Sequence, residues 1–152
     1  MKKYKMFAAV LFSLALSTAL STLSMAGPAA SSPELPRTLA NARFVYVTAY
    51  DGDQFDPGLL PEDRQAIARV QEGIEKWGKL TLVYKPQEAD IVLAVQSRPS
   101  EVVLAVYDAH RGAWGSRPPS TYSWRVMGRG GLQKGEAPLV SQFEKAWEKM
   151  VN

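Results

Sequence analysis

The sequence predicts an α+β fold: a two-layer sandwich in which a mixed sheet of about five strands carries two helices on one face. Three observations lead to this prediction. Five short runs are rich in β-branched and aromatic residues, two longer segments repeat apolar residues at spacings of three and four, and the order along the chain is strand, helix, four strands, helix. Because an apolar helix stripe and a half-buried strand each need an apolar partner, the helices are expected to pack on the sheet.

The first strand and the first helix have the clearest signals. Residues Arg43–Tyr50 read RFVYVTAY and are apolar on both faces, which is typical of a strand inside a sheet. A helix is expected at Pro61–Trp77, with proline at its first position, Glu62 and Asp63 at the positive end of the helix dipole and Gly78 at its exit. Its apolar stripe is formed by Ile67, Val70, Ile74 and Trp77.

The rest of the domain is expected to complete the sheet and to add a second helix. Further strands are predicted at Leu80–Tyr84, Ile91–Val95, Val102–Tyr107 and Tyr122–Met127. The last of these alternates apolar and polar residues, as an edge strand with one wet face does. The helix between the first two strands indicates a parallel pair, whereas the links among the last three permit antiparallel pairing. The second helix is expected at Pro138–Asn152.

The N-terminus has the three parts of a secretory signal peptide. Three lysines precede an apolar run from Met6 to Leu23, and Ser24-Met25-Ala26 places small residues before a cut ahead of Gly27. We therefore expect a signal peptide at residues 1–26, a flexible leader at 27–40 and one α+β domain at 41–152. The mature chain is expected in the periplasm or the secreted fraction. The alternative is an uncleaved N-terminal anchor, and membrane association is expected only in that case.

Charge and composition exclude several classes of protein. The formal charge of +3 comes from the three lysines of the signal peptide, and from Gly27 onward fifteen basic residues balance fifteen acidic ones. This balance gives no support to nucleic-acid binding. Without cysteine, the chain has no disulfides, no thiol nucleophile and no thiolate metal site. The mature charge is uneven, with −4 up to Asp108 and +4 after it, which indicates either interleaved halves or a basic face.

Several segments resemble small exported bacterial proteins of unassigned activity, many of them from soil bacteria such as Acidobacteria. The segments are NARFVYVTAYDGD (41–53), KWGKLTLVYKPQEADIVLAV (76–95), LAVYD (104–108), WRVMGRGG (124–131) and PLVSQFEKAW (138–147). The chain also has a strand, then a turn of sequence Pro-x-x-Ala-Asp, then an aliphatic strand. This succession is similar to one found in periplasmic assembly domains such as the N-terminal domain of the Tol-system propeller protein. The resemblance implies the fold and an extracytoplasmic location, and it leaves the activity open.

A short acidic segment is the candidate metal site. Asp51, Asp53 and Asp56 place three carboxylates within six residues at the end of the first strand, and their oxygens could bind a hard cation such as Ca²⁺. The spacing does not match an EF-hand loop. The alternative is a polar turn in which these side chains accept hydrogen bonds from nearby amides.

The stretch from Arg111 to Gly135 is the candidate binding surface, because arginine and tryptophan on a glycine-rich loop suit stacking on sugars or docking of a protein. The candidate binding residues are Arg111, Trp114, Arg117, Trp124, Arg125 and Arg129. The alternative places Trp124 in the core, Trp114 over a sheet edge and the arginines in solvent.

These observations favour binding over catalysis. We expect an exported interaction module without a cofactor, with a protein or glycan partner in the envelope and with the edge at Tyr122–Met127 open to a partner strand. One alternative is an envelope hydrolase that uses a metal at the acidic segment, or His110 as a general base. Another is a purely structural envelope protein.

Overall fold

The computed structural model describes residues 33–152 except 112–113 and 115–117. The expected signal peptide, the leader up to residue 32 and the candidate residue Arg117 lie outside the described residues. Within the described part, no helix has the length and apolarity needed to cross a bilayer.

The structure confirms the α+β fold class and the mixed five-stranded sheet. The strands are β1 (Phe44–Ala49), β2 (Thr81–Val83), β3 (Ile91–Ser97), β4 (Glu101–Asp108) and β5 (Trp124–Arg129). They lie in the order β2-β1-β3-β4-β5. β1 runs parallel to both β2 and β3, and β4 runs antiparallel to both of its neighbours, β3 and β5. The predicted parallel pair, the antiparallel pairs and the edge position of the last strand are therefore confirmed.

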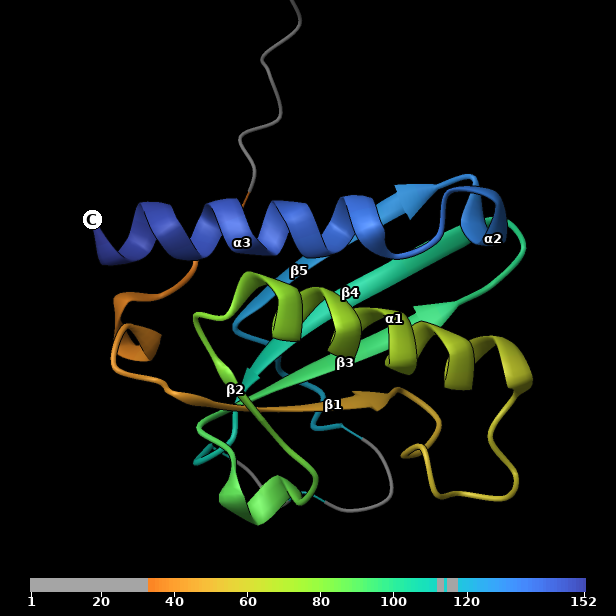
Figure 1. Ribbon diagram of the computed structural model, residues 1–152, viewed down its shortest axis with the longest axis horizontal. Helices are drawn as coiled ribbons and strands as arrows, with labels where there is room; N and C mark the ends of the chain where they lie inside the picture. Colours follow the sequence, from red (N-terminus) through yellow and green to blue (C-terminus); the bar gives the residue numbers. More distant parts are fainter. Residues whose placement is uncertain (1–32, 112–113, 115–117) are drawn as a thin grey trace, which may run out of the picture. The chain divides into compact units, whose positions relative to one another are not determined.

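Two long helices cover one face of the sheet (Figure 1). α1 (Pro61–Trp77) has the predicted bounds and ends at Gly78, whose φ of 70° is left-handed and lets its N–H reach the carbonyl of Ile74. α3 (Ala137–Val151) begins one residue before the predicted start. Three short elements were not predicted: the one-turn helix α2 (Gly131–Lys134) and two 3-10 turns, η1 (Arg37–Leu39) and η2 (Pro86–Glu88).

The turn after β5 lies against the turn between β3 and β4. Gly130 donates its N–H to the carbonyl of Ser100 at 3.2 Å. Gly131 has a φ of 44°, and a Cβ at this position would collide with the carbonyl oxygens of Arg98 and Pro99. Only glycine fits here, because both the backbone conformation and the close approach exclude a side chain.

The main core lies between the sheet and the two helices. Strand residues such as Val47 and Leu93 face α1, and Phe143 of α3 lies at the centre of an aromatic group. The ring centroid of Phe143 is 5.9 Å from that of Trp77 and 6.0 Å from that of Trp124, and both pairs pack edge to face. These contacts join both helices to β5.

The second half of the expected flexible leader is packed on this core. Leu35 and Leu39 are 5% and 3% exposed, and both belong to the main core. The indole Nε1 of Trp124 donates a hydrogen bond to the carbonyl of Pro33 at 2.6 Å. The prediction of a flexible segment over residues 27–40 is thus corrected for residues 33–40, because two buried leucines and a hydrogen bond attach them to the domain.

We expect Leu39→Ala to lower the free energy of unfolding by about 2–4 kcal/mol, because it removes a buried side chain and leaves a cavity. Thr38→Ala, at an exposed neighbouring position, should change it by less than about 0.5 kcal/mol. Chemical denaturation of both variants measures the difference. Equal stabilities for the two would contradict the packing of the leader.

Candidate functional site

The face of the sheet opposite the helices has a small apolar core of its own. It is formed by Tyr46, Ala89, Val92, Ala94, Ala105 and Tyr107. Trp114, from the connection between β4 and β5, packs edge to face on Tyr107 with ring centroids 5.5 Å apart. The indole Nε1 donates to the carbonyl of Ala109 at 3.1 Å. Trp114 therefore covers part of this face.

Two tyrosines of this face are held in their neutral form. Burial raises the pKa of Tyr107, and a hydrogen bond with the hydroxyl of Tyr50 raises it further. Burial also raises the pKa of Tyr46, with a smaller contribution from the negative charge of Asp53. Both hydroxyls therefore stay protonated well above neutral pH, where they can donate as well as accept hydrogen bonds.

The exposed edge of β5 carries a row of arginine and apolar side chains. We call Tyr122, Arg125, Met127 and Arg129 the β5 edge surface. Tyr122 and Met127 are 47% and 57% exposed, and both are among the large hydrophobic side chains that the described structure leaves in contact with solvent. The guanidinium of Arg125 lies 5.8 Å from the centre of the Tyr122 ring, and its Nη2 is 3.3 Å from the sulfur of Met127. In the described residues, no carboxylate forms an ion pair with Arg125 or Arg129.

The five candidate binding residues that the structure describes do not form one surface. Trp124 is 1% exposed and lies in the main core, on the helix side of the sheet, whereas Arg125 lies on the opposite face. Trp114 packs on Tyr107, and Arg111 forms an ion pair with Asp108 at 3.5 Å. Of these five described residues, Arg125 and Arg129 belong to the β5 edge surface.

The candidate binding residues did not include Tyr122 and Met127, although both belong to the expected edge strand Tyr122–Met127. The alternation of side chains along a strand could have indicated Met127, whereas Tyr122 precedes β5 and is brought to this surface by its contact with Arg125. Because Trp124 and Val126 point into the core, Arg125 and Met127 must point to the other face.

The carboxylates of the candidate metal segment are engaged in local interactions. Asp53 and Asp56 each accept a backbone N–H two residues ahead, from Phe55 and Gly58, at 2.8 Å. Asp51 forms an ion pair with Arg98 at 2.8 Å. Within the described part of the chain, no group of three or more Asp, Glu or His side chains is arranged to hold a metal. These contacts match the polar-turn alternative, and calcium binding at Asp51, Asp53 and Asp56 stays a prediction.

A buried ion pair joins the start of α1 to the end of β3. Asp63 is 1% exposed, and its Oδ1 accepts the backbone N–H of Ser97 at 2.9 Å. Nη1 of Arg98 lies 2.8 Å from Oδ2 of Asp63, while Nη2 binds Asp51. Arg98 thus bridges two carboxylates, and the loop between β1 and α1 is fixed at both of its ends.

His110, the candidate general base, has an exposed ring. Asp108 accepts the backbone N–H of His110 at 3.0 Å, so this neighbouring carboxylate does not orient the ring. The ring Nε2 lies 3.5 Å from Oδ1 of Asp90. The other oxygen of Asp90 accepts the backbone N–H groups of Arg43 and Phe44 at 2.8 and 3.0 Å. Asp90 therefore holds the start of β1 beside β3, and His110 contacts it from outside.

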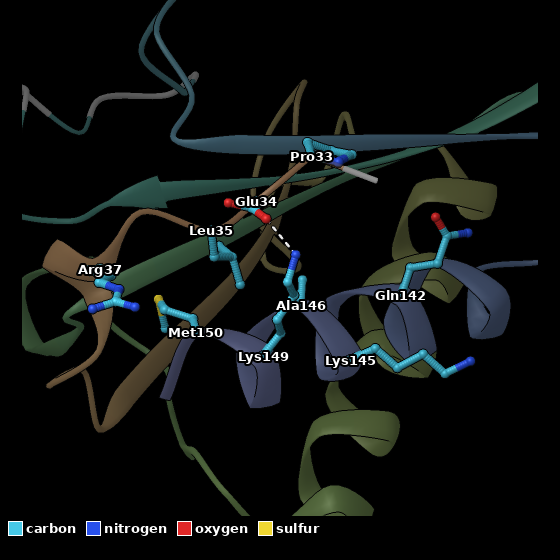
Figure 2. Close-up of a pocket in the computed structure, with 9 residues that line it drawn as sticks. All are labelled: Pro33, Glu34, Leu35, Arg37, Gln142, Lys145, Ala146, Lys149 and Met150. Atoms are coloured by element: carbon cyan, nitrogen blue, oxygen red, sulfur yellow. Dashed lines mark hydrogen bonds and ion pairs between the residues drawn. The ribbon is translucent and has the colours of Figure 1, made fainter. Parts of the chain in front are cut away.

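A pocket of about 480 Å³ lies between the leader and α3 (Figure 2). Its apolar lining includes Leu35, Ala146 and Met150, and its basic lining is Arg37, Lys145 and Lys149. We call it the leader pocket. The carboxylate of Glu34 contacts Lys149 at its rim, as the dashed line in Figure 2 marks.

Comparison with known proteins identifies no family. No family model matches the chain, and no curated protein matches it. Among solved structures, the PelC dodecamer from Paraburkholderia phytofirmans is 17% identical, with 76% of this chain and 93% of that chain covered and a TM-score of 0.45. A variant of that dodecamer is 16% identical, with 79% of this chain and 92% of that chain covered and a TM-score of 0.41. Uncharacterized lipoprotein B from Nitrosomonas europaea is 14% identical, with 78% of this chain and 83% of that chain covered and a TM-score of 0.32. Likeness at this level carries no argument about the function of this chain.

We expect Asp63→Asn to lower the free energy of unfolding by about 2 kcal/mol, because it removes a buried charge that pairs with Arg98. Glu62→Gln is the matched control: it removes an exposed carboxylate from the same helix turn and should cost under about 1 kcal/mol. Denaturant unfolding measures both variants. If both variants lost the same free energy of unfolding, the carboxylate of Asp63 would contribute only through the helix dipole, and its pairing with Arg98 would add nothing.

Asp90 should make the fold more stable at neutral than at acid pH. Partial burial raises its pKa, but the hydrogen bonds from Arg43, Phe44 and His110 outweigh burial and leave the pKa below its ordinary value of 3.8. A carboxylate whose pKa is lowered in the folded state contributes stability that is complete above the unfolded pKa and is lost as the pH falls through the folded pKa. Asp90→Asn should therefore destabilise the protein at pH 7, and the difference from the natural chain should shrink below about pH 4.

Glu144 is the control of opposite sign. Burial and the charge of Glu148 raise its pKa, so ionisation of this side chain opposes folding at neutral pH. Glu144→Gln should therefore leave stability at pH 7 unchanged or increased. Unfolding curves of the three proteins between pH 2 and 7 measure the effect. If Asp90→Asn were as much less stable than the natural chain at pH 2 as at pH 7, the ionised carboxylate of Asp90 would not be the source of the stability.

Proposed function

We propose that this chain is an exported, non-catalytic binding module, and that it binds an extended segment of a protein partner along the outer edge of β5. The exported location rests on the signal-peptide pattern at residues 1–26, and the binding mode rests on the sheet. An added strand gains main-chain hydrogen bonds from the edge and side-chain specificity from the residues beside it.

The observation that carries the proposal is the open side of β5. This strand ends the order of the sheet, so no strand of the described chain pairs with its outer side. In an antiparallel strand, alternate residues direct their N–H and C=O groups away from the neighbour that is already paired. β5 is six residues long, whereas β2, the strand at the opposite edge, has three. The longer edge offers more hydrogen bonds to a partner strand.

Charge on the β5 edge surface indicates which strands would bind. Arg125 and Arg129 flank the exposed Met127 at spacings of two on one face of the sheet. A partner strand with an acidic residue beside each arginine and an apolar residue beside Met127 would complete this pattern. A basic strand would be repelled. The same arginines oppose pairing between two copies of β5, because like charges placed side by side are destabilising.

Reversal of this charge should abolish binding. In the double variant Arg125→Glu/Arg129→Glu, we expect at least tenfold weaker capture of the partner, because two favourable charge contacts become repulsive. The partner is the protein recovered with the tagged, exported chain from envelope and culture-fluid extracts, and surface plasmon resonance measures its affinity. Lys76→Glu/Lys79→Glu is the matched control, since it makes the same change in net charge at exposed positions away from β5.

Thermal unfolding separates loss of binding from loss of fold. Arg125 is only partly exposed, so the single variant Arg129→Glu, at an exposed position, provides a second test and should weaken binding several-fold. Unchanged affinity of the folded double variant would overturn the proposal. Equal losses in both double variants would indicate a general effect of net charge instead of a site on β5.

A further inference from the structure

We propose that the leader pocket binds an anionic single-chain amphiphile, that is, an acyl chain ending in a negatively charged head group. This site is separate from the β5 edge surface and does not depend on the function proposed for it. The pocket has the size of a ligand site, it has two kinds of lining, and an ion pair within the protein already places a carboxylate at its rim.

The size and walls of the pocket suit a small ligand. Its volume of about 480 Å³ lies within the range of small-molecule sites, which is roughly 300–1,000 Å³. One wall is the leader, fixed by the buried side chain of Leu35 and by the hydrogen bond from Trp124 to Pro33. The other wall is α3, fixed by the burial of Phe143 and Trp147. Both walls are therefore formed before a ligand arrives, which reduces the cost of binding.

The pocket combines an apolar part with basic side chains. Leu35, Ala146 and Met150 supply apolar surface, and methionine adapts its shape to a flexible chain. Arg37, Lys145 and Lys149 supply three positive charges against the single carboxylate of Glu34. This imbalance favours an anionic head group over a neutral or cationic one.

Glu34 occupies the position that the head group would take. Its carboxylate contacts the ammonium group of Lys149, and this contact, with a smaller contribution from the charge of Arg37, lowers the pKa of Glu34. Among the described residues, neither Lys145 nor Arg37 has an ion-pair partner of its own. The pocket thus has charge for a second carboxylate, and Glu34 competes with it. Figure 2 shows Lys149 and Glu34 facing each other across the gap between α3 and the leader.

Laurate, a carboxylate with a twelve-carbon chain, is the probe, used below its micelle concentration with the exported chain. Isothermal titration calorimetry should show one laurate bound per chain. Acetate, which has the head group without the chain, and dodecyltrimethylammonium, which has the chain with the opposite charge, should each bind at least tenfold more weakly. Vesicles of phosphatidylglycerol form a fourth arm. Binding to the vesicles without binding to laurate would indicate a membrane surface and would overturn the proposal.

Variants of opposite expected sign give the sharpest test. Lys145→Gln/Lys149→Gln should weaken laurate binding about tenfold, because two attractive charges are lost. Glu34→Gln should tighten it several-fold, because the competing carboxylate is removed. All three side chains are exposed, so we expect the fold to be kept. Lys76→Gln/Lys79→Gln, which removes two exposed charges elsewhere, should leave the affinity unchanged.

The apolar part of the pocket is tested without a change in charge. Ala146→Leu extends a larger side chain into the cavity and should weaken laurate binding at least tenfold, while thermal unfolding shows whether the fold is kept. Absence of laurate binding, or binding of several laurates per chain that none of the variants changes, would overturn the proposal. So would equal effects of the Lys145/Lys149 and Lys76/Lys79 variants.

Discussion

The central strands of this sheet are apolar on both faces, and most of the architecture follows from that constraint. Val92, Ala94 and Ala105 are as fully buried as Leu93 and Leu104, although the two sets point to opposite sides of the sheet. Burial of one face alone would leave a large apolar patch in water. The helices cover one face, and Trp114 helps to cover the other. Trp114, one of the candidate binding residues, therefore has a structural role.

Two kinds of contact attach the leader and the first helix to the sheet, and the first helix uses both. Leu35 and Leu39 extend the apolar core, and their contribution depends on the area that they bury. Asp63 and Arg98 instead form a buried polar contact, which requires a specific geometry and so fixes where α1 begins relative to β3. The buried leucines therefore act through the area that they remove from water, whereas the ion pair fixes the position of α1 relative to β3.

Local patterns predicted the elements well because their causes are local. Periodicity and capping residues gave α1 with correct bounds, and alternation placed β5 at an edge. The parallel pairing of β1 with β3, the docking of the leader and the bridge from Arg98 to Asp63 depend on residues far apart in sequence, and no local pattern indicates them. For the candidate site, counting arginine and tryptophan found Arg125 and Arg129. It also included Trp124, because composition ignores the face on which a side chain lies.

The close contact at Gly131 fixes the alignment of β5 against β4. A shift of one residue in one direction would bring the side chain of Leu132 to the place where only glycine fits against Arg98 and Pro99, whereas a shift in the other direction would bring Gly130 there. Such a slip would also turn Trp124 toward solvent and Arg125 into the core. The edge is therefore protected against the sliding that makes many exposed strands promiscuous and prone to aggregation. A strand held in this way always shows the same residues, so it can distinguish among incoming strands by their order of side chains.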